Sequence, residues 1–146
     1  MVVQKLIIYT DGASRNNQVK DKAVAGAGAY ITDADGKVLK ECTEYLGNQT
    51  NNFAEYQAII LGLTEAKKIV GAAAKDTHLD VRMDSELAVR QLNGLYRVKH
   101  PVLREQFDRV MTIASHFPHI TFTHVPREKN KEADRLSNEA IDNHKA

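Results

Sequence analysis

Four acidic residues occupy places where a fold of alternating strands and helices would gather them. Asp11 ends an apolar run, and Asp84 ends an alternating one. Glu55 and Asp134 each lie within about the first turn of a helical pattern. Closely held carboxylates repel one another unless cations neutralise them, and their hard oxygens suit Mg²⁺ or Mn²⁺ rather than zinc. The four residues therefore indicate a divalent-metal site, provided that the fold brings them together.

Each carboxylate also has a purely structural interpretation. The segment Asn52-Phe53-Ala54-Glu55 matches a capping box, in which Glu55 would only cap its own helix. Asp134 would complement a helix dipole, and Asp84 would simply begin a helix. Asp11 and the glycine after it would form a plain turn. Taken one at a time these readings are adequate, so the positions of the surrounding elements decide between them.

Hydrophobic periodicity predicts five strands and four helices in the order β-β-β-α-β-α-α-β-α. The first three strands form an antiparallel meander, joined by the Asp33-Ala34-Asp35-Gly36 turn. The order implies an α/β fold: a five-stranded mixed sheet with helices on both faces, whose strand ends at one edge offer a ligand site. The predicted strands are 5–11, 26–32, 38–46, 78–83 and 120–125; the helices are 53–70, 85–92, 101–117, and from a cap at Asn130 to about 143.

Composition sets broad limits on the class of protein. With 146 residues, 42% hydrophobic and 27% charged, the chain reads as one globular domain over 1–146 and excludes a disordered chain. No apolar run approaches the ~20 residues of a membrane span, and the N-terminus lacks a signal pattern, which predicts a cytoplasmic protein. The single cysteine, Cys42, reads as a small buried strand residue. Twenty Lys and Arg against 19 Asp and Glu argue mildly against nucleic acid as a partner.

Four short motifs overrule that argument. In order along the chain they are Tyr9-Thr10-Asp11-Gly12-Ala13-Ser14, Thr50-Asn51-Asn52-Phe53-Ala54-Glu55, Met83-Asp84-Ser85 and Asn130-Lys131-Glu132-Ala133-Asp134. Together, each at a predicted strand or helix end, they resemble type 1 ribonuclease H over residues 5–140. The predicted order of strands and helices is also the order that this family's fold requires.

The resemblance implies an endonuclease that hydrolyses the RNA strand of an RNA–DNA hybrid and leaves a 5′-phosphate and a 3′-hydroxyl. It assigns two divalent ions, Mg²⁺ or Mn²⁺, to the catalytic site. Recognition is expected through duplex shape and the 2′-hydroxyl, with no base readout. The carboxylates that map onto the metal ligands are Asp11, Glu55, Asp84 and Asp134, and the residues that map onto hybrid contacts are Gly12, Ala13, Ser14, Asn51 and Asn52.

Three departures from the family pattern affect the expected contacts. The segment 15–23 after the first motif is longer and more polar than the usual loop, and its contacts are not carried over. Only the short segment 96–100 separates the second and third helices, so the chain resembles the branch without the basic handle. The loop before the last helix has Arg127 near the place of the usual histidine. Arg127 cannot act as a base, but it can bind a phosphate, whereas His124 falls within the preceding strand pattern.

Two other functions fit parts of the pattern. A strand-transfer enzyme on the same fold would use three main carboxylates and usually carries DNA-binding domains. An inactive binding module would have lost acidic ligands, and all four are present here. The sequence leaves open the preferred metal, any activity on double-stranded RNA, and the oligomeric state. It shows no apolar repeat that demands a protein partner, so we expect a monomer.

Overall fold

The computed structural model describes residues 2–16 and 22–144. The sheet has the strand order β3-β2-β1-β4-β5. Strands β1 to β3 pair antiparallel, while β4 and β5 run parallel to β1, which confirms the expected mixed sheet. The elements are β1 (Gln4–Arg15), β2 (Val24–Asp33), β3 (Val38–Gly47), α1 (Asn51–Val70), η2 (Gly71–Asp76), β4 (Thr77–Met83), α2 (Glu86–Leu92), α3 (Pro101–Ala114), β5 (His119–His124), η3 (Arg127–Lys129) and α4 (Lys131–Asp142).

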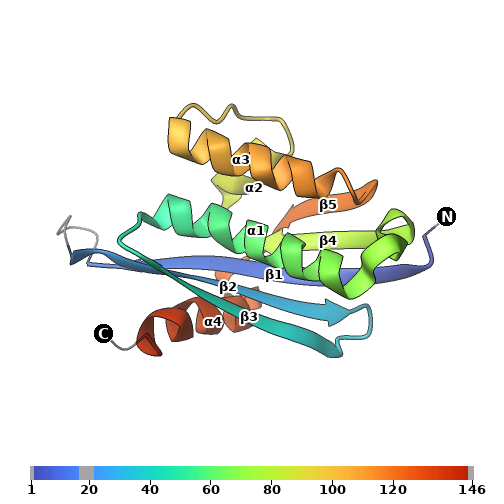
Figure 1. The fold of residues 1–146 in the computed structure, drawn as a ribbon, viewed down its shortest axis with the longest axis horizontal. Helices are drawn as coiled ribbons and strands as arrows, with labels where there is room; N and C mark the ends of the chain where they lie inside the picture. The colour runs from blue at the N-terminus through green and yellow to red at the C-terminus, as the bar shows by residue number, and fades with distance from the viewer. Residues whose placement is uncertain (1, 17–21, 145–146) are drawn as a thin grey trace.

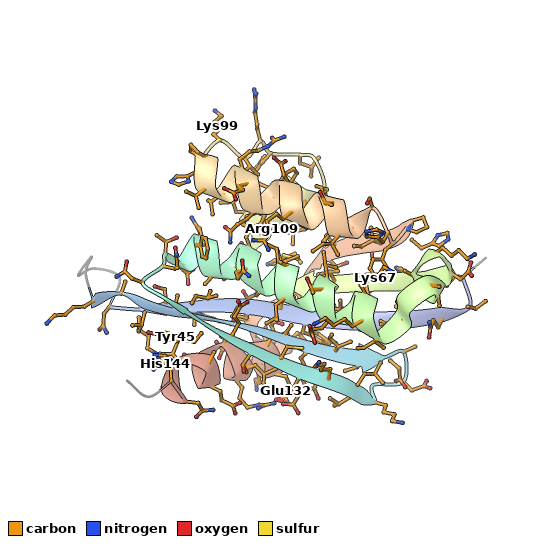
Figure 2. All side chains as sticks on the ribbon, in the orientation of Figure 1. Tyr45, Lys67, Lys99, Arg109, Glu132 and His144 are labelled. Atoms are coloured by element: carbon orange, nitrogen blue, oxygen red, sulfur yellow. The ribbon has the colours of Figure 1, made fainter. Side chains whose placement is uncertain are left out.

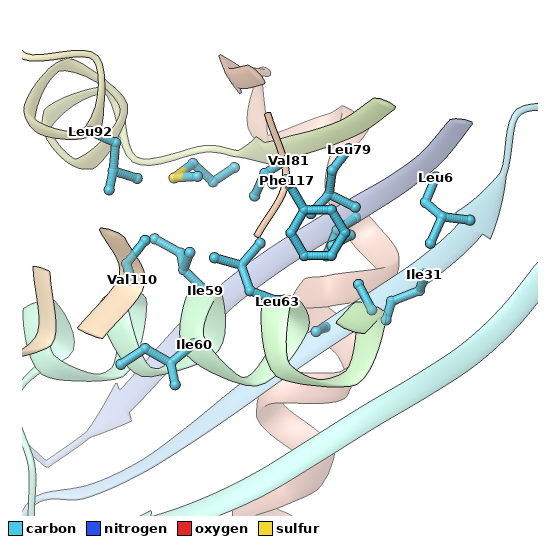
Figure 3. Close-up of a cluster of buried hydrophobic side chains, with 14 of the residues drawn as sticks. Leu6, Ile31, Ile59, Ile60, Leu63, Leu79, Val81, Leu92, Val110 and Phe117 are labelled. Atoms are coloured by element: carbon cyan, nitrogen blue, oxygen red, sulfur yellow. The ribbon is translucent and has the colours of Figure 1, made fainter. Parts of the chain in front are cut away.

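Helices cover both faces of this sheet. Figure 1 shows α1 and α3 on one side of the strands and α4 on the other. The main core lies between the sheet and α1, where alternate residues of β1 and β4 meet the apolar stripe of the helix (Figure 3). Its fully buried members include Ile8, Leu63, Leu79 and Val81. A core of this kind fixes α1 across the middle of the sheet, and with it every side chain that α1 carries.

Helix α1 begins and ends on signals that the sequence contains. The Thr50 hydroxyl accepts a hydrogen bond from the Phe53 amide at 3.1 Å, and Gly71 ends the helix at φ 54°. Asn52 already lies inside the first turn, so the Asn52–Glu55 capping box does not form. The purely structural reading of Glu55 is therefore wrong, because Thr50 caps the helix.

Strand β1 is longer than predicted, and Asp11 does not end it. Pairing with β4 stops at Thr10, opposite Met83, but antiparallel pairing with β2 continues to Arg15, opposite Val24. The Asp11-Gly12 pair is therefore extended strand and no turn. The sequence pattern of β1 gave no sign of this, because the continuation depends on a partner strand and not on local turn chemistry. Asp11 is consequently the first residue of β1 beyond the parallel pairing.

The end of one helix also differs from the prediction. Helix α3 ends at Ala114, short of the predicted 117, and Phe117 turns back into the core, where it is 1% exposed.

Cys42 lies buried on β3 as expected, and burial raises the pKa of its thiol to about 11. Of the polar segment 15–23, residues 17–21 lie outside the described part of the chain. No helix in the described residues is long and apolar enough to cross a membrane.

Helix α4 packs unusually close to β2, because glycine replaces a side chain at the contact. A Cβ built on Gly28 would lie 2.5 Å from the Ser137 backbone nitrogen and 2.7 Å from the Ala133 oxygen. At its other end, the rings of Tyr45 on β3 and His144 stack with centroids 3.6 Å apart (Figure 2). The helix is thus held along its whole length against the face of the sheet opposite α1.

We predict that Gly28→Ala lowers the free energy of unfolding by about 1–3 kcal/mol or more, because backbone cannot yield to the added methyl group as a flexible side chain would. Chemical denaturation followed by circular dichroism measures the change. Gly36→Asn is the matched control: a Cβ there meets nothing within 4 Å, and Asn tolerates the positive φ of Gly36. Equal stability of Gly28→Ala and the parent protein would contradict the close packing of α4.

Candidate active site

Parallel pairing brings Asp11 and Asp84 to one edge of the sheet. Asp84 directly follows β4, and Asp11 directly follows the last β1 residue that pairs with β4. Because the carboxyl ends of adjacent parallel strands meet at the same edge, the two carboxylates become neighbours although 73 positions separate them. Asp11 is 6% exposed, and Asp84 is half-buried.

Glu55 reaches the same edge from helix α1, again through a glycine. A Cβ on Gly12 would lie 2.3 Å from both the Ala54 carbonyl carbon and the Glu55 amide nitrogen, so only glycine allows α1 to lie this close to β1. The Gly12 backbone N–H bonds to the Glu55 carboxylate and lowers the pKa of that group. Gly12 therefore positions a carboxylate, whichever substrate contact it also makes.

Asp134 approaches from the opposite face of the sheet on α4. Asp11 pairs with Gly28 across β1 and β2, and Gly28, together with Gly26, allows α4 to approach β2. Asp134 shares a side-chain hydrogen bond with Asp11. Asn138, one turn further along α4, donates to the Asp134 carboxylate at 3.3 Å. The site is thus assembled from both faces of the sheet.

The three carboxylates of Asp11, Glu55 and Asp84 form the compact part of the site. One oxygen of each lies within 4.8 Å of the others. Asp134 adjoins this group through Asp11 and is not a member of it. Hard carboxylate oxygens at this spacing are the donor set that Mg²⁺ and Mn²⁺ take, and the residues present therefore fit divalent cations.

The pKa values of the carboxylates also favour a bound cation at the site. Burial, followed by the charges of Glu55 and Asp84, raises the pKa of Asp11 to about 9. Burial, followed by the charge of Asp84, raises the pKa of Glu55 to about 8. At neutral pH the carboxylates alone therefore resist being charged together. A bound cation reverses this penalty, because it favours the ionised form of each ligand.

The residues predicted to touch the hybrid surround the carboxylates. Asn51 and Asn52 are exposed in the first turn of α1. Ala13 and Ser14 follow Gly12 on the extension of β1, where the Ser14 hydroxyl donates to the Gln49 carbonyl at 3.0 Å. A shallow hollow lined by Asn52, Glu55 and Ser85 adjoins the site. Such an open surface suits a duplex better than a small enclosed ligand, and the individual contacts stay predictions.

Arg127 and His124 differ in what they face. The positive charge of Arg127, in η3, lowers the pKa of Glu55, so the guanidinium lies within electrostatic range of that carboxylate. His124 is the exposed last residue of β5, and its charge acts on Glu86 at the start of α2. The charge of Arg127 thus acts on a carboxylate of the site, whereas His124, which pairs with Met83 at the end of β4, acts on Glu86 outside it.

One residue at the site was predicted in a different role. Asn130 stands at the N-cap of α4 as expected, but its side chain makes no capping hydrogen bond. It is 1% exposed and donates to the Thr10 carbonyl and to the Asp84 carboxylate. The sequence carries no signal for this orientation, because an asparagine directly before a helix whose first turn is acidic matches ordinary helix capping.

Comparisons with known proteins agree with this fold. A sequence profile described as reverse transcriptase-like matches residues 9–140. LC11-RNase H1, isolated from compost by a metagenomic approach, is 46% identical, with 97% of this chain and 98% of that chain covered and a TM-score of 0.87. The structure of LC11-RNase H1 in complex with an RNA/DNA hybrid aligns with a TM-score of 0.86 at 45% identity, covering 94% of this chain and 97% of that chain. The fold is thus that of the ribonucleases H.

Two curated relatives are longer proteins. The bifunctional protein Rv2228c of Mycobacterium tuberculosis is 42% identical over 139 residues, which are 94% of this chain and 36% of the relative. Ribonuclease HI of Halobacterium salinarum is 37% identical over 134 residues, 92% of this chain and 63% of the relative. The chain thus spans between about a third and two thirds of their length. On these similarities the chain belongs to the ribonuclease H1 family.

The raised pKa values predict how stability depends on pH. Folding favours the protonated forms of Asp11 and Glu55, so the stability they contribute is full below about pH 4 and is lost as pH rises through about 8 to 9. In EDTA we therefore expect the melting temperature to fall between pH 5 and pH 9, as measured by circular dichroism. Mg²⁺ at pH 8 should raise it, because the cation neutralises the repulsion.

Asp11→Asn tests the origin of this dependence, since it removes the most strongly shifted carboxyl. Its melting temperature in EDTA should exceed that of the parent protein at pH 8 and should fall less between pH 5 and pH 9. Asp35→Asn, a change to an exposed carboxylate in the β2–β3 turn, is the control and should follow the parent curve. Parallel curves for Asp11→Asn and the parent protein would show that no repulsion is stored at the site.

Proposed function

We propose that this protein is an endoribonuclease that hydrolyses the RNA strand of RNA–DNA hybrids. The observation that carries the proposal is the carboxylate group of Asp11, Glu55 and Asp84, whose oxygens lie within 4.8 Å of one another at an open edge of the sheet. Support comes from the close similarity to LC11-RNase H1, a protein whose structure with an RNA/DNA hybrid is known. The proposal covers this chain as one catalytic domain over 1–146.

Two divalent cations, Mg²⁺ or Mn²⁺, are proposed as cofactors at this group, with Asp134 as the fourth carboxylate. When bound, such a pair supplies an activated water at neutral pH and stabilises the charge on the leaving 3′ oxygen, so the products carry a 5′-phosphate and a 3′-hydroxyl. The chain's own part is to hold Asp11 and Glu55 in a buried, water-poor setting where cations outcompete protons. Arg127 lies within electrostatic range of Glu55 and is suited to bind a phosphate of the substrate bidentately.

The proposed substrate contacts explain why a hybrid would be selected. Gly12, Ala13 and Ser14 lie on β1, and Asn51 and Asn52 lie at the start of α1, which the hydrogen bond from Ser14 to the Gln49 carbonyl holds near β1. Amide and hydroxyl groups of this kind contact sugars and phosphates, and a 2′-hydroxyl distinguishes RNA from DNA at a given place. Recognition of this type reads backbone shape on both strands, and it needs no base-specific side chain.

A gel assay with labelled hybrid, double-stranded DNA and double-stranded RNA tests the substrate class directly. We expect cleavage of the RNA strand of the hybrid in Mg²⁺ or Mn²⁺ and none in EDTA. Cleavage of double-stranded DNA in preference to the hybrid would favour the strand-transfer class on the same fold. Absence of any cleavage, with metal-dependent stabilisation retained, would favour an inactive binding module.

Asp11→Asn and Asp84→Asn should each lower hybrid cleavage by more than about 100-fold, since changes merely behind metal ligands already cost about 10–100-fold. Both changes preserve side-chain shape while removing a charged ligand. Initial rates on a fluorescent hybrid give the measurement, and Asp35→Asn, with its exposed carboxylate, serves as the matched control. Cleavage by Asp11→Asn within about tenfold of the parent rate would rule out the metal-site assignment.

Arg127→Ala should lower turnover by about tenfold or more. His124→Ala should lower turnover by much less than the loss of about 10²–10⁴-fold that is expected when a general acid or base is removed. The difference follows from their places: the charge of Arg127 acts on Glu55, and that of His124 acts on Glu86. Lys129→Ala removes an exposed cation from the same η3 segment and is the control. A hundredfold loss in His124→Ala with normal circular dichroism would reverse the assignment.

A further inference from the structure

Asn130 holds a helix-capping position without capping the helix. Its backbone stands at the N-cap of α4, but no backbone amide of the first turn donates to its side chain. The side chain is instead turned into the protein, where Nδ2 lies 3.0 Å from the Thr10 carbonyl oxygen and 3.4 Å from Oδ2 of Asp84. Both acceptors belong to the edge of the sheet that carries the carboxylate site.

Helix stability does not account for this arrangement. Asparagine is among the preferred N-cap residues because its oxygen accepts an amide of the first turn, and that bond is missing here. The Oδ1 atom of Asn130 is also buried without a hydrogen-bond partner among the described residues. The amide orientation follows from chemistry, since a flipped amide would set Oδ1 against a carbonyl and a carboxylate. The residue thus forgoes one stabilising bond and leaves an acceptor unpaired in order to donate toward the site.

Asn130 adjoins three of the four carboxylates through different atoms. Its Nδ2 bonds to the carboxylate of Asp84 directly. The same nitrogen bonds to the carbonyl of Thr10, whose peptide leads into Asp11. Its own carbonyl accepts the backbone N–H of Asp134 at 3.1 Å in the first turn of α4. One buried residue therefore links β1, the end of β4 and the start of α4 at the point where their acidic side chains converge.

We propose that Asn130 is a positioning residue for the metal site. A donor on Oδ2 restricts rotation of the Asp84 carboxylate, and the bond to Thr10 fixes the distance between β1 and the start of α4. Partners behind metal ligands act in this way, by holding ligand orientation before the metal binds. The inference rests on the proposed function and assigns Asn130 no contact with the substrate or the metal.

A matched residue separates this role from general stabilisation. Gln106 on α3 is also a buried amide, 3% exposed, whose Nε2 donates to a backbone carbonyl, that of Phe53, at 3.0 Å. Its Oε1 is likewise buried without a partner among the described residues. Its other hydrogen-bond partner is the Gln57 amide, so it reaches no carboxylate of the site. Replacing Gln106 removes a similar structural bond and leaves the carboxylates untouched.

The experiment compares Asn130→Ala, Asn130→Ser and Gln106→Ala with the parent protein. Serine is itself a favourable N-cap, so Asn130→Ser supports α4 while its hydroxyl is too short to reach Asp84. The first readout needs no nucleic acid: the melting temperature is followed during addition of Mn²⁺, and the half-maximal concentration is recorded. The second is kcat and KM on an RNA–DNA hybrid at saturating Mn²⁺.

For both Asn130 variants we expect the half-maximal Mn²⁺ concentration to rise by about tenfold or more and kcat to fall by about 10–100-fold, the range for partners of metal ligands. KM for the hybrid should be nearly unchanged, because Asn130 is buried and cannot touch a duplex. Gln106→Ala should lower the melting temperature in EDTA while keeping the parent Mn²⁺ dependence and kcat.

Parent-like Mn²⁺ dependence and kcat in Asn130→Ser would overturn the positioning role, and so would loss of folding in both Asn130 variants with Gln106→Ala folded. The proposed function fails in a different way. A parent protein that binds Mn²⁺ but leaves the hybrid intact refutes the nuclease activity, and the Mn²⁺ series still decides the role of Asn130. A parent protein that Mn²⁺ does not stabilise refutes the metal site and the positioning role together.

Discussion

Repulsion between like charges is the constraint that the arrangement of this site must overcome. Oxygens of Asp11, Glu55 and Asp84 lie within 4.8 Å of one another in a partly buried setting, where the charge of Asp84 raises the pKa of both Asp11 and Glu55. Separate flexible loops would move such groups apart. Here they are carried by a central strand, the end of the adjacent parallel strand and a helix packed on a dry core, so moving apart would mean disrupting that core. The apolar interior thereby maintains a charge arrangement that either protonation or a bound cation relieves.

Close approach of backbones is the second requirement, and glycine provides it on both faces of the sheet. Gly12 lets α1 lie against β1, and Gly28 lets α4 lie against β2 from the other side. Because Asp11 pairs with Gly28 in the sheet, both approaches converge on the same strand position. Two missing Cβ atoms thus bring Glu55 and Asp134 to a carboxylate that neither helix could otherwise reach.

The sequence predicts the order of strands and helices along the chain well, since alternation and helical spacing are local signals, and three of the predicted carboxylates, those of Asp11, Glu55 and Asp84, do lie together. It fails where the outcome depends on a distant partner. The continuation of β1 past Asp11 follows from pairing with β2, and the inward turn of Asn130 follows from Thr10 and Asp84. Net charge misleads for the same reason. Arg135 contacts Glu41, Glu132 and Glu139, so much of the positive charge is neutralised within the protein and says little about partners.

The placement of α4 on the far face has a consequence for the order in which the protein is made. Synthesis as far as β5 produces the whole sheet, with Asp11, Glu55 and Asp84 already encoded, but it leaves out the helix that brings Asp134. The face of β1 and β2 that α4 covers is then exposed, and at Gly28 it consists of backbone without a side chain. A nascent chain therefore holds its acidic cluster incomplete until α4 emerges from the ribosome and docks on the sheet. The four carboxylates therefore come together only after α4 has been translated.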